Sequence, residues 1–143
     1  MSGYGSGLMP PPKLRVLIAD DHRLFAESLM TVLSADERID VVGLAGNGEE
    51  AVGLADDLRP DIVLMDLKMP VVDGLEATRR IRDAGLPSAV ILLTGEDTAP
   101  LALQAREAGA HAFVRKDQSI ESFKSVFFEV ASLVSLLVRN PAV

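Results

Sequence analysis

Three aspartates stand at the ends of short apolar runs of the sequence. Asp66 follows the run at residues 62–65, and Asp20 and Asp21 follow the run at residues 14–19. Such runs predict strands buried on both faces of a parallel sheet, and the carboxyl ends of these strands meet in one crevice. Three carboxylates in one crevice repel one another unless a cation compensates them. We expect oxygen ligands alone, without histidine or cysteine, which favours a hard ion such as Mg2+.

Two later apolar runs end in residues of other chemical types. Thr94 follows the run at residues 89–93 and offers a hydroxyl donor, and Lys116 follows the run at residues 112–114 after one arginine. The chain therefore offers an acid pair, a single acid, a hydroxyl and a lysine in that order, each near the predicted end of a strand. Helix-like segments separate the runs, a pattern typical of a parallel sheet with right-handed crossovers.

Each of these residues also has a plainer interpretation when it is taken alone. Asp20 or Asp21 would serve as a helix N-cap, because an acid often precedes an amphipathic helix. Thr94 would be a turn residue and Lys116 a solvated surface lysine. Asp66 is harder to explain in this way, since an uncompensated carboxylate at the end of a buried strand is costly. The ordered set favours one shared site over separate roles.

This ordered set resembles the receiver domain of response regulators, the phosphorylatable module of bacterial two-component signalling. The resemblance rests on Asp20-Asp21, residues 65–70, Asp73-Gly74, Thr94-Gly95 and residues 109–116, and it spans residues 13–137. It implies an α/β fold: a flavodoxin-like, doubly wound, five-stranded parallel sheet in the order 2-1-3-4-5, with helices on both faces and an extended C-terminal helix. The implied function is that of a signalling phosphoacceptor that catalyses its own phosphorylation and dephosphorylation, and not that of a conventional enzyme.

The resemblance also implies a role for single residues. Asp66 would accept a phosphoryl group from a sensor histidine kinase or a histidine phosphotransfer protein and form an aspartyl phosphate. Lys116 would pair with the phosphate, and the Thr94 hydroxyl would donate to it. Phosphorylation would draw Thr94 inward and vacate space for Phe113, so that the two residues form a switch. A plain core role for Phe113 is an equal alternative.

By the same resemblance, Mg2+ is the cofactor. Asp21, Asp66 and the backbone carbonyl of Lys68 would bind the ion directly, and Asp20 would act through water. Lys68 and Glu96 flank the expected phosphate site in positions that tune the lifetime of phosphorylated receivers. We therefore expect the phosphorylated lifetime of this chain to depend on both side chains.

Composition limits the function classes that remain. The chain has 143 residues, a formal net charge of −7 and no cysteine, which predicts one domain with a continuous core. We place a flexible tail at residues 1–12, the receiver domain at residues 13–138 and a C-terminal tail at residues 139–143.

The acidic net charge argues against direct nucleic-acid binding. Because the sequence offers neither an apolar stretch of about twenty residues nor a signal pattern, we expect a cytoplasmic protein without a membrane span.

The segment at residues 119–138 predicts a long helix that is apolar on more than one face. Either this is an ordinary last helix with some exposed apolar side chains, or its outer face binds a second copy, a further domain or another partner.

The pattern of residues 47–51 with Lys116-Asp117 is similar to receivers of NarL/FixJ-type transcription factors, which carry a helix-turn-helix domain. We slightly favour the receiver part of such a regulator, controlling transcription through a domain absent here, over a stand-alone single-domain response regulator.

Two other function classes compete with the phosphoacceptor. A hydrolase or phosphatase with a nucleophilic aspartate would usually carry a second acid two residues after Asp66, together with a cap insertion, but Lys68 stands at that position. A degenerate receiver-like module that only binds partners is disfavoured by the intact acidic set. Phosphorylation with a small phosphoryl donor separates the three classes.

Overall fold

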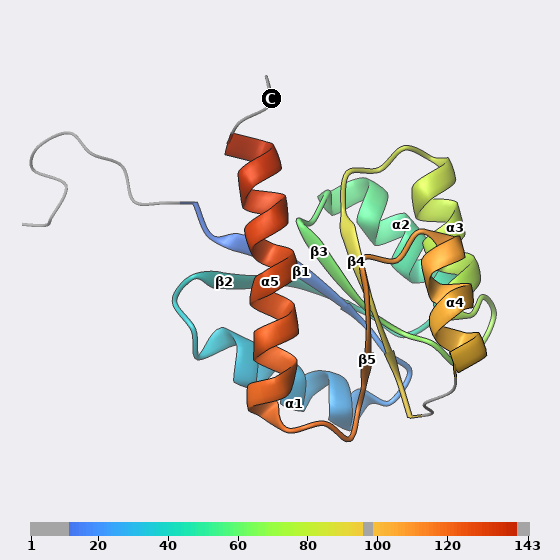
Figure 1. Ribbon diagram of the computed structural model, residues 1–143, viewed down its shortest axis with the longest axis horizontal. Coiled ribbons are helices and arrows are strands. Elements are labelled where there is room, and N and C mark those ends of the chain that lie inside the picture. Colours follow the sequence, from blue (N-terminus) through green and yellow to red (C-terminus); the bar gives the residue numbers. More distant parts are fainter. Residues whose placement is uncertain (1–11, 96–98, 140–143) are drawn as a thin grey trace, which may run out of the picture.

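The computed structural model describes residues 12–95 and 99–139, with side chains as far as Val134. Strands and helices alternate along these residues (Figure 1). The strands are β1 (Leu14–Ala19), β2 (Ile39–Ala45), β3 (Ile62–Asp66), β4 (Ala89–Thr94) and β5 (Ala112–Arg115). The helices are α1 (Arg23–Ser34), α2 (Gly48–Leu58), α3 (Gly74–Asp83), α4 (Ala99–Ala108) and α5 (Ile120–Arg139).

The five strands form one parallel sheet in the order β2-β1-β3-β4-β5. This confirms the predicted flavodoxin-like arrangement. The central strands β3 and β4 are buried along their whole lengths, because helices cover both faces of the sheet (Figure 1). The carboxyl ends of β1, β3 and β4 therefore lie next to one another at one edge.

Alternating strand side chains build two hydrophobic clusters, one on each face of the sheet. Val16 and Ile18 of β1 belong to the cluster that includes side chains of α1 and α5. Leu17 and Ala19 belong to the opposite cluster, which includes side chains of α2, α3 and α4. Because side chains pack against both faces of the sheet, the strands are held in place. The loops at the carboxyl edge therefore start from fixed positions.

Two of these loops end at the N-cap residues of α1 and α3. His22 is the N-cap of α1, and its side chain makes no cap hydrogen bond to the helix. The plainer interpretation of Asp20 or Asp21 as the N-cap is therefore wrong. Asp73 is the N-cap of α3, where its side chain accepts a hydrogen bond from the Glu76 backbone N–H.

The fully buried side chains of helix α4 are small. The helix buries Ala105 and Ala108, and Leu101 is half-buried. These small side chains remove little apolar surface from water.

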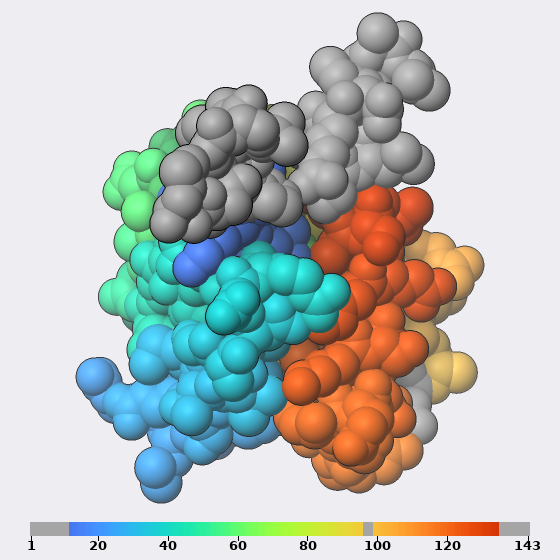
Figure 2. Space-filling model, turned by 90° about the vertical axis from the view of Figure 1, so that its left-hand side faces the viewer, coloured from blue at the N-terminus to red at the C-terminus, as the bar shows by residue number. Residues whose placement is uncertain are grey.

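Helix α5 confirms the extended C-terminal helix. Its buried stripe consists of Phe123, Phe127, Val130 and Ala131. Figure 2 shows α5, in orange and red, beside α1 and the start of β2, in blue and cyan. Leu133 on the outer side is more than half exposed, and the side chains of the last apolar positions lie outside the described residues. Among the described helices, α5 included, none has both the length and the apolar character needed to span a membrane.

Candidate functional site

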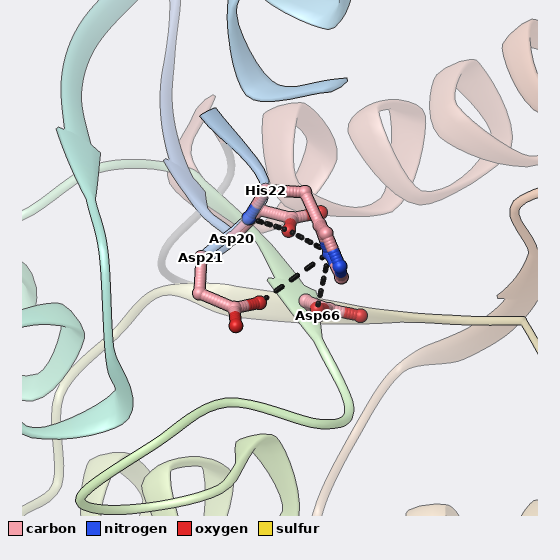
Figure 3. Close-up of side chains that lie close together, drawn as sticks. All are labelled: Asp20, Asp21, His22 and Asp66. Carbon is pink, nitrogen blue, oxygen red and sulfur yellow. Dashed lines mark hydrogen bonds and ion pairs between the residues drawn. The ribbon is translucent and has the colours of Figure 1, made fainter. Parts of the chain in front are cut away.

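The acidic pocket forms where β1 and β3 end side by side in the sheet. Asp66 is the last residue of β3 and is 4% exposed, and Asp20 directly follows β1 and is 3% exposed. Parallel pairing of Ala19 with Met65 brings the two carboxylates to the same edge. Asp21 lies at the exposed rim of the pocket. Figure 3 shows these side chains turned toward one another.

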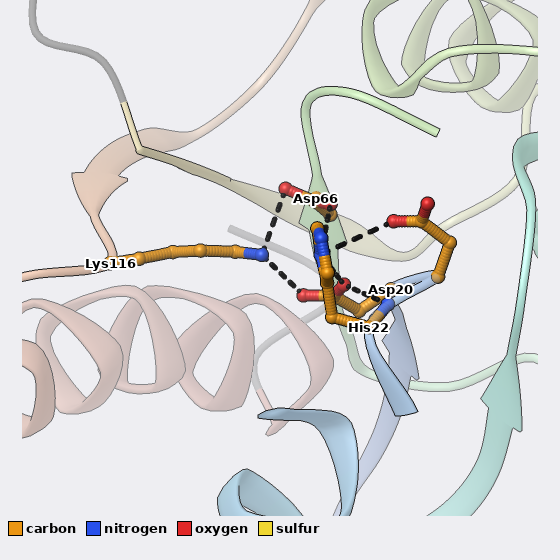
Figure 4. Close-up of polar contacts among 5 residues, drawn as sticks. Asp20, His22, Asp66 and Lys116 are labelled. Carbon is orange, nitrogen blue, oxygen red and sulfur yellow. Dashed lines mark hydrogen bonds and ion pairs between the residues drawn. The ribbon is translucent and has the colours of Figure 1, made fainter. Parts of the chain in front are cut away.

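Lys116 reaches this pocket from the end of β5. Its Nζ lies 2.7 Å from Asp20 Oδ2 and 3.2 Å from Asp66 Oδ1 (Figure 4). The backbone N–H of Lys116 donates to the Thr94 carbonyl at 2.7 Å, which fixes where the lysine leaves the sheet. Only 18% of the Lys116 side chain is exposed, so the plainer interpretation of a solvated surface lysine is wrong.

Phe25 of α1 supports the lysine from the other side. The Lys116 Nζ lies 4.4 Å from the centre of the Phe25 ring, a distance at which the ring face attracts a cation. Both side chains line a mainly apolar cavity of about 130 Å3 that α1 shares with α5, whose Phe123 also borders it. The ammonium is thus held between an aromatic face and two carboxylates.

The burial of Asp66 beside a second acid changes its pKa. Burial, reinforced by the negative charge of Asp20, raises the pKa of Asp66 from 3.8 to about 6, although Lys116 acts in the opposite direction. Lys116 therefore offsets only part of the cost of ionising Asp66 in this buried position. A carboxylate that is costly to ionise in this way marks a functional site more often than a structural one.

The donor atoms of the pocket also fit a bound cation. Within the described residues, Asp66 Oδ2 is buried and has no hydrogen-bond partner. One ligand atom from each of Asp20, Asp21, His22 and Asp66 lies within 4.8 Å of the others. A buried carboxylate oxygen without a donor is stabilised by a metal ion as well as by a proton. The residues present therefore fit a divalent ion.

His22 is the member of this cluster that the sequence analysis missed. Its Nδ1 lies 3.2 Å from Asp20 Oδ1 and 3.4 Å from Asp21 Oδ1. The expectation that no histidine lies near the acids is therefore wrong, whereas the set of metal ligands itself stays a prediction. The available signal was simple, since His22 directly follows the acid pair.

Three of the remaining predicted site residues lie on β4, on β5 and in the loop after β3. Thr94 is buried at the end of β4 and pairs in register with Arg115 of β5. Lys68 is exposed in the loop after β3. Phe113 is half-buried on β5 and packs against the cluster below α2, α3 and α4. Glu96 lies outside the described residues.

The loop between β3 and α3 contains a backbone conformation that valine adopts rarely. Val71 has a φ of +70° and is 72% exposed, while Val72 beside it is buried. A β-branched residue at positive φ is strained, and such strain often accompanies functional loops. The same loop carries Lys68 and is fixed at its end by Gly74, where a Cβ would come within 2.2 Å of the Asp66 carbonyl oxygen.

A buried acid at the end of β3, an acidic pair after β1 and a lysine after β5 define, with this strand order, the class of two-component receivers. The chain belongs to the response regulator receiver domain family, whose sequence profile matches residues 16–127. This confirms the predicted resemblance. The chain is thus a receiver domain, the signalling phosphoacceptor module, and its relatives include regulators of the NarL and LuxR groups.

Individual relatives agree with this assignment. The chain is 40% identical over 108 residues to the transcriptional regulatory protein YdfI of Bacillus subtilis, covering 76% of this chain and 50% of YdfI. It is 37% identical over 109 residues to the transcriptional regulatory protein NarL of Mycobacterium tuberculosis, covering 76% and 50%. The solved receiver domain of that NarL superposes with a TM-score of 0.79 at 35% identity, covering 85% of this chain and 98% of that one. The chain spans about half the length of these curated relatives.

Proposed function

We propose that Asp66 accepts a phosphoryl group from a phosphohistidine on a sensor histidine kinase or a histidine phosphotransfer protein. A carboxylate oxygen of Asp66 forms the new P–O bond, the P–N bond breaks, and the electron pair leaves with the imidazole. The observation that carries this proposal is the buried Asp66 carboxylate, which has Lys116 on one oxygen and no hydrogen-bond partner among the described residues on the other.

The same proposal gives the neighbouring residues their roles. Lys116 pairs with the incoming phosphoryl oxygens and is already within 3.2 Å of Asp66 Oδ1. The Thr94 hydroxyl donates to the phosphate, and its movement together with Phe113 forms the switch that reports phosphorylation. Lys68 and Glu96 tune the lifetime of the phosphorylated state.

We also propose that Mg2+ is the cofactor. Asp21, Asp66 and the backbone carbonyl of Lys68 would hold it, with Asp20 acting through water. The ion would supply positive charge next to oxygens that become more negative during transfer. A related chemotaxis protein gives support, since a CheX–CheY complex of Borrelia burgdorferi was solved with beryllofluoride and Mg2+; its structure matches with a TM-score of 0.78 at 25% identity.

For the output, we propose control of transcription by a longer regulator of which this chain is the receiver part. The support is that YdfI and NarL are named transcriptional regulators and are about twice as long as the matched region. In this proposal residues 13–138 form the receiver between two tails, and a second copy of the chain binds along α5. The protein is cytoplasmic, and the receiver does not itself bind nucleic acid. The alternative is a stand-alone regulator that acts by protein contacts.

The test is phosphorylation by acetyl phosphate, followed by intact mass measurement. We expect one added phosphoryl group in Mg2+, none in EDTA and none in the Asp66→Asn variant. The matched control is Asp57→Asn, which removes an exposed aspartate of α2 and should be phosphorylated like the parent chain. Turnover of acetyl phosphate without an adduct would favour a hydrolase, and an inert protein would favour a module that only binds partners.

A further inference from the structure

The His22 imidazole occupies a defined place above the acidic pocket. Its Nδ1 lies between carboxylate oxygens of both preceding acids and 3.9 Å from Asp66 Oδ2 (Figure 3). The ring therefore reaches across from the end of β1 to the end of β3. No role in phosphoryl transfer assigned above requires a nitrogen atom at this position.

The turn after β1 and the start of α1 are both consistent with this placement of the ring. The His22 backbone N–H donates to Asp20 Oδ1 at 2.8 Å, which forms a tight turn directly after β1. His22 is also the N-cap of α1, but its ring makes no cap hydrogen bond with that helix. The imidazole is thus directed to the acids and away from the helix end. Since 69% of the His22 side chain is exposed, an ion from solvent can reach it.

A second, independent observation points to a bound cation at the same place. Asp66 Oδ2 is buried and lacks a hydrogen-bond partner within the described residues, although it lies under the imidazole. The four candidate ligand atoms lie within 4.8 Å of one another. Donors on opposite sides of an ion with bonds of about 2.1 Å are about 4.2 Å apart, so this spacing is compatible with an ion that has both the imidazole and the carboxylates around it.

We propose that His22 is a nitrogen ligand of this pocket, which makes the pocket a site for a divalent transition ion of the imidazole-binding kind. The inference rests on the metal pocket of the proposed function and extends it to metal preference. Carboxylates alone suit Mg2+, whereas an added neutral imidazole favours Co2+, Ni2+ and Zn2+ over Mg2+. The pocket would then fill with such an ion at concentrations at which Mg2+ leaves it mostly empty.

The test is direct titration of the purified metal-free chain with Co2+ and, separately, with Mg2+ by calorimetry at about pH 8, because a metal binds only a deprotonated imidazole nitrogen. Three variants are compared with the parent chain: His22→Gln, Asp66→Asn and the matched control His111→Gln, which removes the other histidine. Visible absorption of bound Co2+ and the proton NMR signals of the His22 ring give readouts that do not depend on phosphorylation.

We expect His22→Gln to weaken Co2+ binding by at least about tenfold and Mg2+ binding by less than about threefold. His111→Gln should change neither, Asp66→Asn should weaken both, and Co2+ should shift the His22 ring signals but not those of His111. Equal losses for both metals in His22→Gln, or unshifted His22 signals, would overturn the inference and leave the ring as a partner of the carboxylates alone.

The proposed function is judged separately, by Mg2+-dependent phosphorylation of the His22→Gln variant. A phosphorylated variant with unchanged metal preference refutes the ligand role and keeps the phosphoacceptor. An unphosphorylated parent chain that still binds Co2+ through His22 keeps the metal site and refutes the phosphoacceptor. Co2+ binding that survives Asp66→Asn unchanged places the ion elsewhere and also overturns the inference.

Discussion

The Asp66→Asn substitution should stabilise the metal-free protein at neutral pH, although it removes the proposed phosphoacceptor. The pKa of Asp66 is raised from 3.8 to about 6, mainly by burial and to a smaller extent by the negative charge of Asp20. The folded state therefore holds this proton more tightly than the unfolded state does. Ionisation of Asp66 costs nothing well below pH 3.8, and its cost grows as the pH rises and is complete above about pH 6. Asparagine carries no charge and escapes that cost.

The magnitude follows from the size of the pKa shift. A rise from 3.8 to about 6 corresponds to about 3 kcal/mol of lost stability at pH 7.5. Integration over pH gives about half of that at pH 5, because Asp66 is then mostly protonated in the folded state. For a chain of 143 residues, about 3 kcal/mol corresponds to a rise of roughly 10 °C in Tm.

The assay is urea unfolding of the parent and the variant in EDTA at about pH 7.5 and pH 5. Asp57→Asn on α2 is the control for removal of an exposed carboxylate and should leave the free energy of unfolding nearly unchanged. Adding Mg2+ should stabilise the parent, by about 1.4 kcal/mol at ten times its Kd, and should stabilise Asp66→Asn much less. A variant that is no more stable than the parent at pH 7.5, or a gain that is equal at both pH values, would refute this reasoning.

Three further predictions concern the surroundings of the pocket. Gly74→Ala should destabilise the fold by about 2–4 kcal/mol in urea unfolding, because its Cβ would meet the Asp66 carbonyl oxygen at 2.2 Å; an unchanged midpoint would contradict this. Val71→Gly should raise stability by about 1 kcal/mol, since glycine adopts the φ of +70° without strain; equal or lower stability would show that the loop is relaxed. Phe25→Leu should slow phosphorylation by acetyl phosphate about two- to fivefold through loss of the ring beneath Lys116, whereas Phe25→Tyr should restore the rate; equal rates in all three proteins would remove this role.

The sequence contained enough information for the fold and for most of the pocket. Apolar runs separated by helical segments predict a parallel sheet, and the carboxyl ends of its strands must share one edge. Asp20, Asp66 and Lys116 could therefore be expected to converge, and their distances of 2.7 and 3.2 Å agree with that expectation. The predicted long helix at residues 119–138 likewise agrees with α5, and Phe123, Phe127 and Val130, which have helical spacing, are buried.

Three features of the site depend on tertiary contacts that a linear pattern does not encode. His22 is visible in the sequence directly after the acid pair, but the approach of its Nδ1 to within 3.9 Å of Asp66 Oδ2 depends on the pairing of β1 with β3. Phe25 fitted a helical apolar stripe, and its contact with Lys116 arises from the approach of α1 to the end of β5. Val71 has an ordinary sequence context, and nothing in the linear pattern indicates its φ of +70° between the buried Met69 and Val72.

The most direct measurement of the central claim is the position of the phosphoryl group in the chain. The protein is treated with acetyl phosphate and Mg2+, reduced with borohydride, which converts an aspartyl phosphate to homoserine, and mapped by peptide mass spectrometry. We predict homoserine in place of Asp66 alone, dependent on Mg2+. Modification of another carboxylate, or of none, would contradict the account of Asp66 as the phosphoacceptor.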